Sequence, residues 1–308
     1  MEKAFIWCDC DLDGAMSYTT LCWYLEYDIP FRPVTVKDFE QQFSAWIRYN
    51  KDKYEKIFIV DLDVSGTDPA IIDLPNVVII DHHKSHKNEY KNATAIVELE
   101  TSCTKLIYKT VSKKLNITDE QKYLVLLADD YDSYKLQVKD SYNLNVVYWA
   151  YRGNRVQKFY TDFKKGFKGF NNFHKNIILL HSKKFSELKR NLEPYKAFLV
   201  IKGKEIKFVA CFADSCINEL ADYVINKYKA DVGVIVNLNT SRFSLRRSKA
   251  CSIDLSMLIN KIGTGGGHEY AAGGEMNDKF ITFSKLLIPI HEQVSTSTER
   301  LQPKSGNV

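Results

Sequence analysis

The sequence predicts an α/β protein of two domains: an N-terminal, mostly parallel, doubly wound sheet and a smaller C-terminal α/β domain, joined by a helical connector. Three observations carry this prediction. Short apolar runs alternate with helical spacing through residues 1–150, as in a parallel sheet covered on both faces. Residues 151–194 have little strand character and repeat Phe every three or four positions. A second alternation of strands and helices occupies residues 195–294.

The composition fits a globular protein of this size. The 308 residues suffice for two hydrophobic cores, with 45% hydrophobic and 26% charged residues. No run of about 18 apolar residues is present, so no membrane-spanning helix is expected, and the charged N-terminus lacks the form of a signal peptide. Seven cysteines without a CxxC pair favour free thiols and a cytoplasmic location.

In the first domain, residues 1–150, apolar runs and helical spacing give the elements in order. Strands are expected at 4–8, 31–36, 56–60 and 77–80, and helices at 14–27 and 101–115. Thr118-Asp-Glu-Gln121 has the form of a capping box, which predicts a further helix that runs to about Ala128.

The remaining elements follow from the same signals. The connector, 151–194, is predicted to be helical with an interruption near Gly166–Gly169. In the second domain, strands are expected at 197–201, 205–212, 231–238 and 242–246, and helices at 217–228 and 254–262. A glycine-dense segment then leads to His268, and the polar tail 295–308 is predicted to be disordered.

The net charge of +5 conceals an uneven distribution. Residues 1–150 carry 17 Lys/Arg against 24 Asp/Glu, whereas residues 151–190 carry 11 against 2. Most Phe residues of the basic stretch are expected to pack in a core, because they recur at helical spacing. Basic and aromatic residues interleaved in this way also suit single-stranded nucleic acid, and the concentrated positive charge would attract a polyanion.

Acidic clusters follow four predicted elements of the first domain. Each cluster alone is typical of a turn or helix cap, and adjacent histidines alone are commonly structural. The carboxyl ends of parallel strands gather at one edge of a sheet, however, so we expect the four clusters to converge. They are Asp9, Asp11 and Asp13; Asp61 and Asp63; Asp81-His82-His83; and Asp129, Asp130 and Asp132.

Converging carboxylates repel one another unless a cation neutralises them. Oxygen ligands with one or two imidazoles suit Mn²⁺ or Mg²⁺. This donor set is large enough for two ions about 3.5–4 Å apart, which activate water and stabilise charge on a transferring phosphoryl group.

These motifs together resemble the DHH phosphoesterases. Asp9-Cys-Asp11-Leu-Asp13-Gly14, with Ser17, is similar to the first motif of this family, and Asp61 to the second. Asp81-His82-His83 is similar to the third motif, and Asp129-Asp130 to the fourth. Gly265–Gly273 resembles the signature of the DHH-associated C-terminal domain, and Ser244–Ser248 resembles its substrate-facing strand. The resemblance covers most of residues 1–290, and the form Asp129-Asp-Tyr-Asp132 looks closest to the oligoribonuclease (nanoRNase B-like), RecJ-like branch.

The resemblance implies a site of two divalent cations, Mn²⁺ in the first place and Mg²⁺ as the alternative. Asp61 would bridge the ions, and His83 would face the scissile phosphate, so that His83, Asp61 and Asp13 form the catalytic centre. Asp130, Asp132 and Asp63 would support the ligands or serve as cap and turn residues. The family often has a His in the first motif, where Trp7 and Asp9 stand here. The implied metal ligands are Asp9, Asp11, Asp13, Asp61, His82 and Asp129.

On the substrate side, glycines let backbone N–H groups approach a phosphate, and a following helix N-terminus would favour an anion. The resemblance makes Gly266, Gly267 and His268 contacts to substrate phosphate or to a terminal nucleotide. Arg246 would be a second phosphate clamp, because a guanidinium pairs bidentately with phosphate. A surface arginine on an edge strand is the alternative reading.

The predicted function is hydrolysis of short RNA or single-stranded DNA from an end to mononucleotides, by two-metal activation of water. The substrate would lie between the two domains. One alternative is a cyclic or linear dinucleotide phosphodiesterase, and another is a catalytically decayed module that binds single strands. The expected partner is a short single-stranded nucleic acid or dinucleotide, with no membrane, in a monomer or homodimer.

Overall fold

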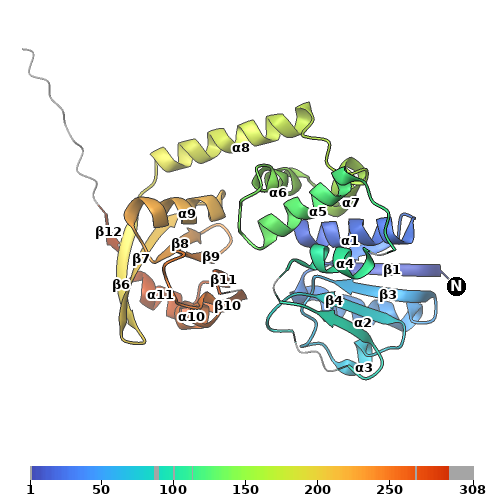
Figure 1. Ribbon diagram of the computed structural model, residues 1–308. Coiled ribbons are helices and arrows are strands. Elements are labelled where there is room, and N and C mark those ends of the chain that lie inside the picture. Colours follow the sequence, from blue (N-terminus) through green and yellow to red (C-terminus); the bar gives the residue numbers. More distant parts are fainter. Residues whose placement is uncertain (1, 87–89, 100, 113, 268, 291–308) are drawn as a thin grey trace, which may run out of the picture. The chain divides into compact units, whose positions relative to one another are not determined.

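The computed structural model describes residues 2–86, 90–99, 101–112, 114–267 and 269–290. Contacts divide the chain into two units between His181 and Ser182. The first unit holds a five-stranded sheet of order β2-β1-β3-β4-β5, in which every pair of neighbours is parallel (Figure 1). Its strands are β1 (Glu2–Cys8), β2 (Phe31–Pro33), β3 (Tyr54–Val60), β4 (Val77–Asp81) and β5 (Thr94–Val97).

Helices cover both faces of this sheet, so the predicted doubly wound fold is confirmed. One core joins residues of α1, α4, α5, α6 and α7 to the sheet, and a separate core on the other face is built largely on α2. The helices are α1 (Leu12–Leu25), α2 (Val36–Asn50), α3 (Pro69–Ile72), α4 (Cys103–Val111), α5 (Asp119–Asp132), α6 (Ser141–Ala150), α7 (Arg155–Phe163) and α8 (Asn172–Arg190).

Local sequence signals explain where several elements begin. The capping box at the start of α5 is present: the Thr118 hydroxyl accepts from the Gln121 N–H, and the Gln121 side chain accepts from the Thr118 N–H. The sequence did not suggest α2, although its buried residues Phe39, Phe43 and Ile47 recur at helical spacing. Strand β5 is four residues long and half-exposed, so it gave no strong apolar run.

The basic stretch folds as two helices, α7 and α8, separated by residues 164–171, which matches the predicted interruption. Phe159, Phe163 and Phe167 are buried in the core of the first unit, so the expected packing role is confirmed for these three residues. Phe173 is 59% exposed. The boundary between the two units falls inside α8, and residues 151–181 belong to the first unit by their contacts.

The second unit holds a seven-stranded sheet of order β10-β11-β9-β8-β7-β6-β12. Only β7 and β8 are parallel neighbours among its pairs in the described residues. One face packs against α9 and the other against α10 and α11. The elements are β6 (Tyr195–Ile201), β7 (Lys204–Phe212), α9 (Ile217–Tyr228), β8 (Val232–Asn237), β9 (Arg242–Arg247), α10 (Leu255–Ile262), β10 (Thr264–Gly267), β11 (Ala271–Glu275), α11 (Asp278–Ser284) and β12 (Ile288–Pro289).

The glycine-dense segment differs from its expected form. It forms β10, which pairs antiparallel with β11, so a strand rather than a helix follows it. The expected helix N-terminus beside this segment was therefore wrong. A Cβ on Gly265 would lie 2.1 Å from the Gly273 carbonyl oxygen, so close strand pairing explains why glycine is needed there.

Three further predictions concern the whole chain. All seven cysteines are free, and only Cys10 is not buried. Within the part of the chain that the structure describes, no helix is long and apolar enough to cross a membrane. The tail predicted to be disordered, 295–308, lies outside the described residues.

Candidate metal centre

The turn after β1 brings the first acidic cluster to the carboxyl edge of the sheet. Asp11 caps α1, and its side chain accepts from the Gly14 N–H at 2.9 Å. The Asp9 carboxylate accepts from the Cys10 N–H at 2.6 Å. A Cβ on Gly14 would lie 2.4 Å from the Asp9 carbonyl oxygen, so only glycine lets the backbone close this tightly.

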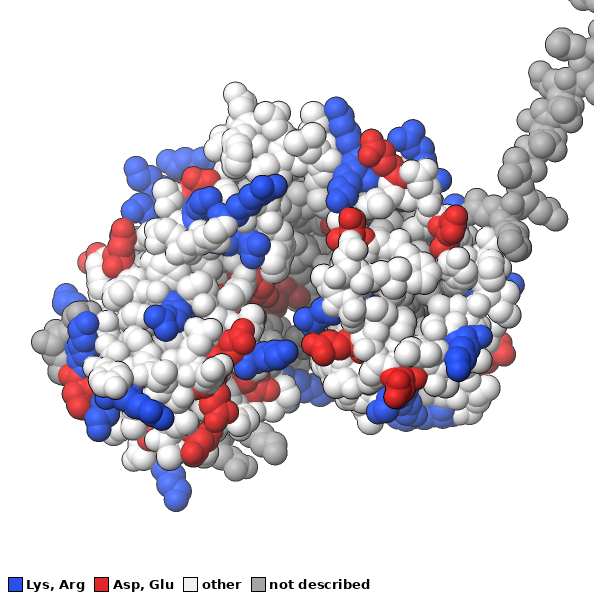
Figure 2. All heavy atoms as spheres, turned by 180° about the vertical axis from the view of Figure 1, so that it is seen from behind, with Lys and Arg blue, Asp and Glu red and all other residues white. Residues whose placement is uncertain are grey.

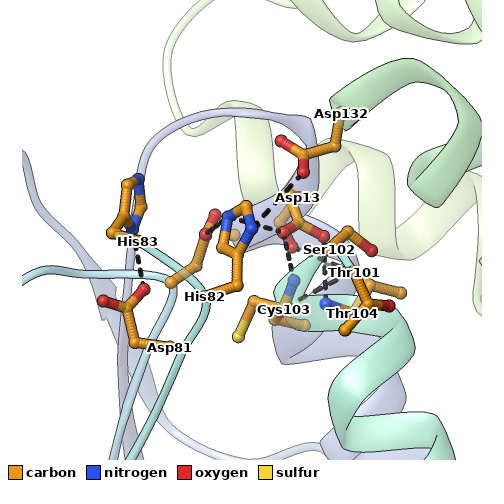
Figure 3. Close-up of polar contacts among 12 residues, drawn as sticks. Asp13, Asp81, His82, His83, Thr101, Ser102, Cys103, Thr104 and Asp132 are labelled. Atoms are coloured by element: carbon orange, nitrogen blue, oxygen red, sulfur yellow. Dashed lines mark hydrogen bonds and ion pairs between the residues drawn. The ribbon is translucent and has the colours of Figure 1, made fainter. Parts of the chain in front are cut away.

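Asp13 is buried and is held by the N-terminus of α4. Its two carboxylate oxygens accept from the backbone N–H of Cys103 at 2.7 Å and of Thr104 at 3.0 Å (Figure 3). The first N–H groups of a helix have no partner within the helix, and the helix dipole favours an anion there. This contact fixes the direction of the Asp13 side chain, although burial raises the pKa of its carboxyl.

Asp61 directly follows β3 in a backbone conformation that is rare outside glycine. Its φ is 59°, and its N–H donates to the Ile80 carbonyl at 3.0 Å. Non-glycine residues in this region cost free energy, and they concentrate at functional sites. Burial, followed by the charges of Asp13 and Asp11, raises the pKa of Asp61 well above its ordinary value.

His82 lies among the carboxylates. Its Nε2 is 3.2 Å from Asp61 Oδ1 and 3.7 Å from Asp13 Oδ2, and its Nδ1 is 3.7 Å from Asp132 Oδ2 (Figure 3). Asp132 ends α5, and its side chain is 23% exposed. Burial and the charge of Asp13 raise the pKa of Asp132 well above its ordinary value.

Asp81 orients two histidines at once. It is fully buried at the end of β4. One oxygen lies 2.7 Å from His83 Nδ1 and the other 2.6 Å from His86 Nδ1. His86 Nε2 is in turn 3.1 Å from the Tyr90 hydroxyl. Burial opposes ionisation of Asp81, but the hydrogen bonds from both imidazoles outweigh it and lower the pKa of the carboxyl.

The contact between Asp81 and His83 shifts the pKa of His83 in the opposite direction. Burial lowers the pKa of the imidazole, but the hydrogen bond and charge of Asp81 outweigh it and raise that pKa to about 9. The contact of Nδ1 with Asp81 fixes the orientation of the His83 ring beside Asp61 and His82.

Asp129, predicted as a metal ligand, has different partners. One oxygen accepts from Lys105 Nζ at 2.6 Å and the other from the Ser102 N–H at 3.1 Å. Burial opposes ionisation, but the hydrogen bonds from Lys105 and from the Ser102 N–H, with the charges of Lys105 and Lys135, together outweigh it and lower the pKa of Asp129. The structure thus satisfies Asp129 within the protein and places Asp132 beside His82.

Two further predicted residues serve local structure. Asp130 accepts from the N–H groups of Gln137 and Val138 and from the Ser141 hydroxyl, so it closes the turn after α5. Asp63 accepts from the Ser65 N–H at 3.1 Å, which is the turn role that the sequence offered as one alternative. Asp63 also belongs to a group with Asp81 and His86.

Among the described residues four groups have the spacing of metal ligands, and three of them share Asp61 or His82. The members of each group offer ligand atoms within 4.8 Å of one another. Asp61 belongs to two of the groups and so does His82, which makes these residues the centre of the cluster. These three groups are Asp61, His82 and His83; Asp13, His82 and Asp132; and Asp9, Asp11 and Asp61.

The electrostatics of the cluster fit a site built for cations. Burial and the neighbouring charge of Asp11 raise the pKa of Asp9 to about 7, and the pKa values of Asp13, Asp61 and Asp132 are raised as well. Such shifts mean that the protein alone does not neutralise these carboxylates. Carboxylate oxygens with an imidazole nitrogen are the donors that Mn²⁺ and Mg²⁺ take, so the residues present fit divalent cations.

Trp7 explains part of the departure in the first motif. Its side chain is fully buried in the core on the α2 face of the sheet, with edge-to-face contacts to Phe39, Phe43 and Trp46. Trp7 is thus a core residue, and Asp9 is the first residue of this motif that reaches the candidate site.

The predicted substrate residues of the second unit lie on its β9-β11-β10 edge. Arg246, on β9, donates to Asn218 Oδ1 at 2.6 Å and to the Leu245 carbonyl at 2.9 Å, and it pairs with Ala271 of β11. A Cβ on Gly266 would meet nothing within 4 Å, whereas Gly267 has a φ of 149°. His268 lies outside the described residues.

Sequence reasoning missed two groups that shape the site. His86 stands three residues after His83, and this spacing was the only available signal. The N-terminus of α4 follows Thr101-Ser102, a pair with capping character, and Ser102 does cap the helix. Neither signal indicates which acidic side chain the His86 imidazole or the N-terminus of α4 contacts.

Comparisons with known proteins agree with this architecture. Residues 3–129 match the family model described as "DHH family, N-terminal domain". No curated protein sequence gives a significant match. Three solved structures illustrate the likeness of fold. The pGpG-specific phosphodiesterase PggH from Vibrio cholerae is 14% identical, with 92% of this chain and 96% of that chain covered and a TM-score of 0.56.

The other two structures differ in size. RecJ from Thermus thermophilus, in complex with Mn²⁺, is 12% identical, with 92% of this chain and 51% of that chain covered and a TM-score of 0.58. An exopolyphosphatase-related protein from Bacteroides fragilis is 14% identical, with 92% and 91% covered and a TM-score of 0.54. At these identities the likeness concerns the fold. Residues 3–129, whose motifs form the acidic edge described above, match the N-terminal domain of the DHH family.

Proposed function

We propose that this protein is a metal-dependent phosphodiesterase that hydrolyses short RNA or single-stranded DNA from an end to mononucleotides. The observation that carries the proposal is the cluster at the carboxyl edge of the first sheet, where several buried carboxylates with raised pKa values surround His82. The match of residues 3–129 to the N-terminal domain of the DHH family supports phosphoester chemistry at this cluster. The RecJ structures solved with Mn²⁺ and with Mg²⁺ support divalent cations in this fold.

In this proposal two divalent cations, Mn²⁺ in the first place, are held by Asp9, Asp11, Asp13, Asp61, His82 and Asp132. Asp132 replaces Asp129 in the ligand set that the family resemblance implied, because Asp129 is already paired with Lys105. Asp61 belongs to two ligand groups, which supports the bridging role. When bound, the ions would activate a water and stabilise negative charge on the phosphoryl group.

The protein groups around the ions position the substrate. The Asp81 contact fixes the His83 ring beside the ligand cluster, where we propose that it faces the scissile phosphate. The N-terminus of α4 and the Gly14 turn hold Asp13 and Asp11 in place before any ion arrives. In the second unit, Arg246, Gly266, Gly267 and His268 are proposed to contact substrate phosphate or the terminal nucleotide.

A test compares the wild type with Asp61→Asn on end-labelled RNA and DNA of two to about twenty nucleotides in Mn²⁺. We expect the wild type to release mononucleotides and the variant to lose more than about 100-fold in rate, since even residues that only support metal ligands cost 10–100-fold. Asp52→Asn, an exposed change in the same unit, is the matched control. Full activity of Asp61→Asn would overturn the site.

A linear or cyclic dinucleotide phosphodiesterase is the second candidate. The pGpG-specific enzyme PggH matches over almost its whole length, and this observation favours the candidate. Length profiling separates the two functions, because a dinucleotide enzyme would cleave dinucleotides and leave longer oligomers intact. The third alternative, a decayed binding module, predicts no turnover with any divalent metal, and the intact ligand cluster argues against it.

The proposal extends to the setting of the enzyme. The free cysteines suit a reducing compartment, which supports the cytoplasmic location inferred from the sequence. The oligomeric state, monomer or homodimer, stays a prediction.

A further inference from the structure

The first unit has a hollow outside the metal centre, formed by the end of α6, by α7 and by the start of α8. Its volume is about 740 Å³, within the range of small-ligand sites. We call it the helical hollow and define it by Arg152, Lys158, Thr161, Asn171, Phe173 and Ile177. None of these residues belongs to the metal centre, and the predicted function assigns none of them a role.

The lining of the hollow suits an anion. Arg152 and Lys158 are exposed cations, and residues 151–177 contain seven Lys or Arg against one acidic residue, Asp162. That carboxylate accepts from the Tyr151 hydroxyl at 2.5 Å and lies 3.2 Å from His174 Nε2. Figure 2 shows Lys and Arg side chains gathered on the upper part of the first unit. Such a surface attracts polyanions.

The hollow also offers an aromatic face. Phe173 is 59% exposed, although its helical neighbour His174 is buried. The lining combines this exposed phenyl ring with cationic and amide side chains. Such a combination binds single strands, because bases stack on the ring while cations contact phosphates. Thr161 and Asn171 add hydrogen-bonding groups without fixing a base sequence.

One helix connects the hollow to the metal centre. The Tyr148 hydroxyl of α6 donates to the Cys10 carbonyl at 2.6 Å, within the turn that carries Asp9 and Asp11. Ala150 and Tyr151, at the end of the same helix, line the hollow. The first unit thus holds the metal centre and the hollow on adjoining segments.

We propose that the helical hollow is a second binding subsite for single-stranded nucleic acid. It holds nucleotides distal to the end that lies at the metal centre. Phe173 stacks on a base, and Arg152 and Lys158 contact backbone phosphates. The distal role rests on the proposed function, but binding at the hollow can be measured without hydrolysis.

The binding test uses fluorescence anisotropy of a labelled 12-nucleotide RNA and DNA in EDTA with the full chain. Phe173→Ala should weaken binding by about fivefold or more, the equivalent of one lost base stack. Phe173→Trp should keep wild-type affinity, since it keeps a stacking face. Arg152→Ala should lower the slope of log K against log salt by about 0.7, the value for one phosphate contact on a single strand.

A matched control changes the same residue types elsewhere in the first unit. Arg48→Ala and Tyr49→Ala remove an exposed cation and an 86% exposed aromatic ring from α2, and both should leave affinity and salt slope unchanged. Hydrolysis of a dinucleotide should keep its wild-type rate in Phe173→Ala, because a dinucleotide at the metal centre has no distal part. Hydrolysis of the 12-mer should slow at low substrate concentration.

The outcomes separate this inference from the proposed function. If no substrate is hydrolysed but Phe173→Ala and Arg152→Ala weaken binding as described, the hollow binds nucleic acid and the proposed function fails. If dinucleotides are cleaved but these variants bind the 12-mer as the wild type does, the function stands and the hollow is not a subsite. Failure of the wild type to bind either 12-mer overturns the inference as well.

Discussion

Asp129 and Asp132 lie three residues apart at the end of α5, and the structure predicts opposite effects when each is changed to Asn. Asp129 has a favourable partner in Lys105, whereas Asp132 faces the carboxylate of Asp13 across His82. Asparagine keeps the size of the side chain and removes its charge. A comparison of the two variants therefore tests which carboxylate is neutralised by other groups of the protein and which needs a cation.

The structure sets the magnitude for the metal-free protein. A hydrogen bond to a charged group contributes about 1.5–3 kcal/mol, but the Lys105 side chain is 35% exposed. Solvent screening therefore places Asp129→Asn at roughly 1–2 kcal/mol of lost stability, or a fall of about 2–8 °C in Tm. Asp132→Asn removes a carboxylate with a raised pKa, so the Tm should stay the same or rise.

The assay is thermal unfolding at pH 7.5, in EDTA and then in 1 mM Mn²⁺. A site with a Kd of about 10 µM gains about 2.7 kcal/mol at this concentration. We expect the wild type and Asp129→Asn to gain this stabilisation, and Asp132→Asn to lose most of it. Asp52→Asn, an exposed position in the same unit, should behave as the wild type in both conditions.

One result would refute this reasoning. If Asp132→Asn kept the Mn²⁺ stabilisation while Asp129→Asn lost it without any fall of the metal-free Tm, Asp129 would be the ligand. The fourth motif would then act as the sequence suggested, and the Lys105 pair would belong only to the metal-free protein.

Three more outcomes follow from the same cluster. Asp9, with a pKa raised to about 7, and Asp61 hold protons in the folded state that the unfolded chain releases above about pH 4. The stability of the metal-free protein should therefore fall as the pH rises from 5 to 7.5. Unfolding in EDTA across this range should show a smaller change of stability with pH for Asp61→Asn than for the wild type. Gly14→Ala would place a Cβ 2.4 Å from a carbonyl oxygen, so activity should drop by on the order of 100-fold with loss of the Mn²⁺-induced Tm shift; an unchanged shift would contradict this. His86→Asn removes one of the two imidazoles on Asp81 and should lower kcat by roughly 10-fold with little change of KM, through misplacement of His83. Steady-state kinetics, with the folded fraction checked by thermal unfolding, would contradict this if kcat were unchanged or fell only in proportion to the folded fraction.

The sequence by itself determined the order of elements and the general place of the chemistry. Alternation of apolar runs and helical spacing indicated a parallel sheet, and the sheet rule placed Asp11, Asp61 and His82 at one edge, where the structure has them. These inferences depend on local backbone periods, which the sequence carries directly. The capping box at Thr118 is local in the same sense.

Only the tertiary structure decided how the acidic residues divide their work. Residues three apart on a helix lie on neighbouring positions of one face, so no pattern separates Asp129 from Asp132. In the structure Asp129 contacts the N-terminus of α4 and Lys105, on segments more than twenty residues away in the sequence, whereas Asp132 lies beside His82. The same holds for His86, whose role depends on the second oxygen of Asp81. Such roles arise from packing between elements that are distant in the sequence, and a local sequence pattern does not record that packing.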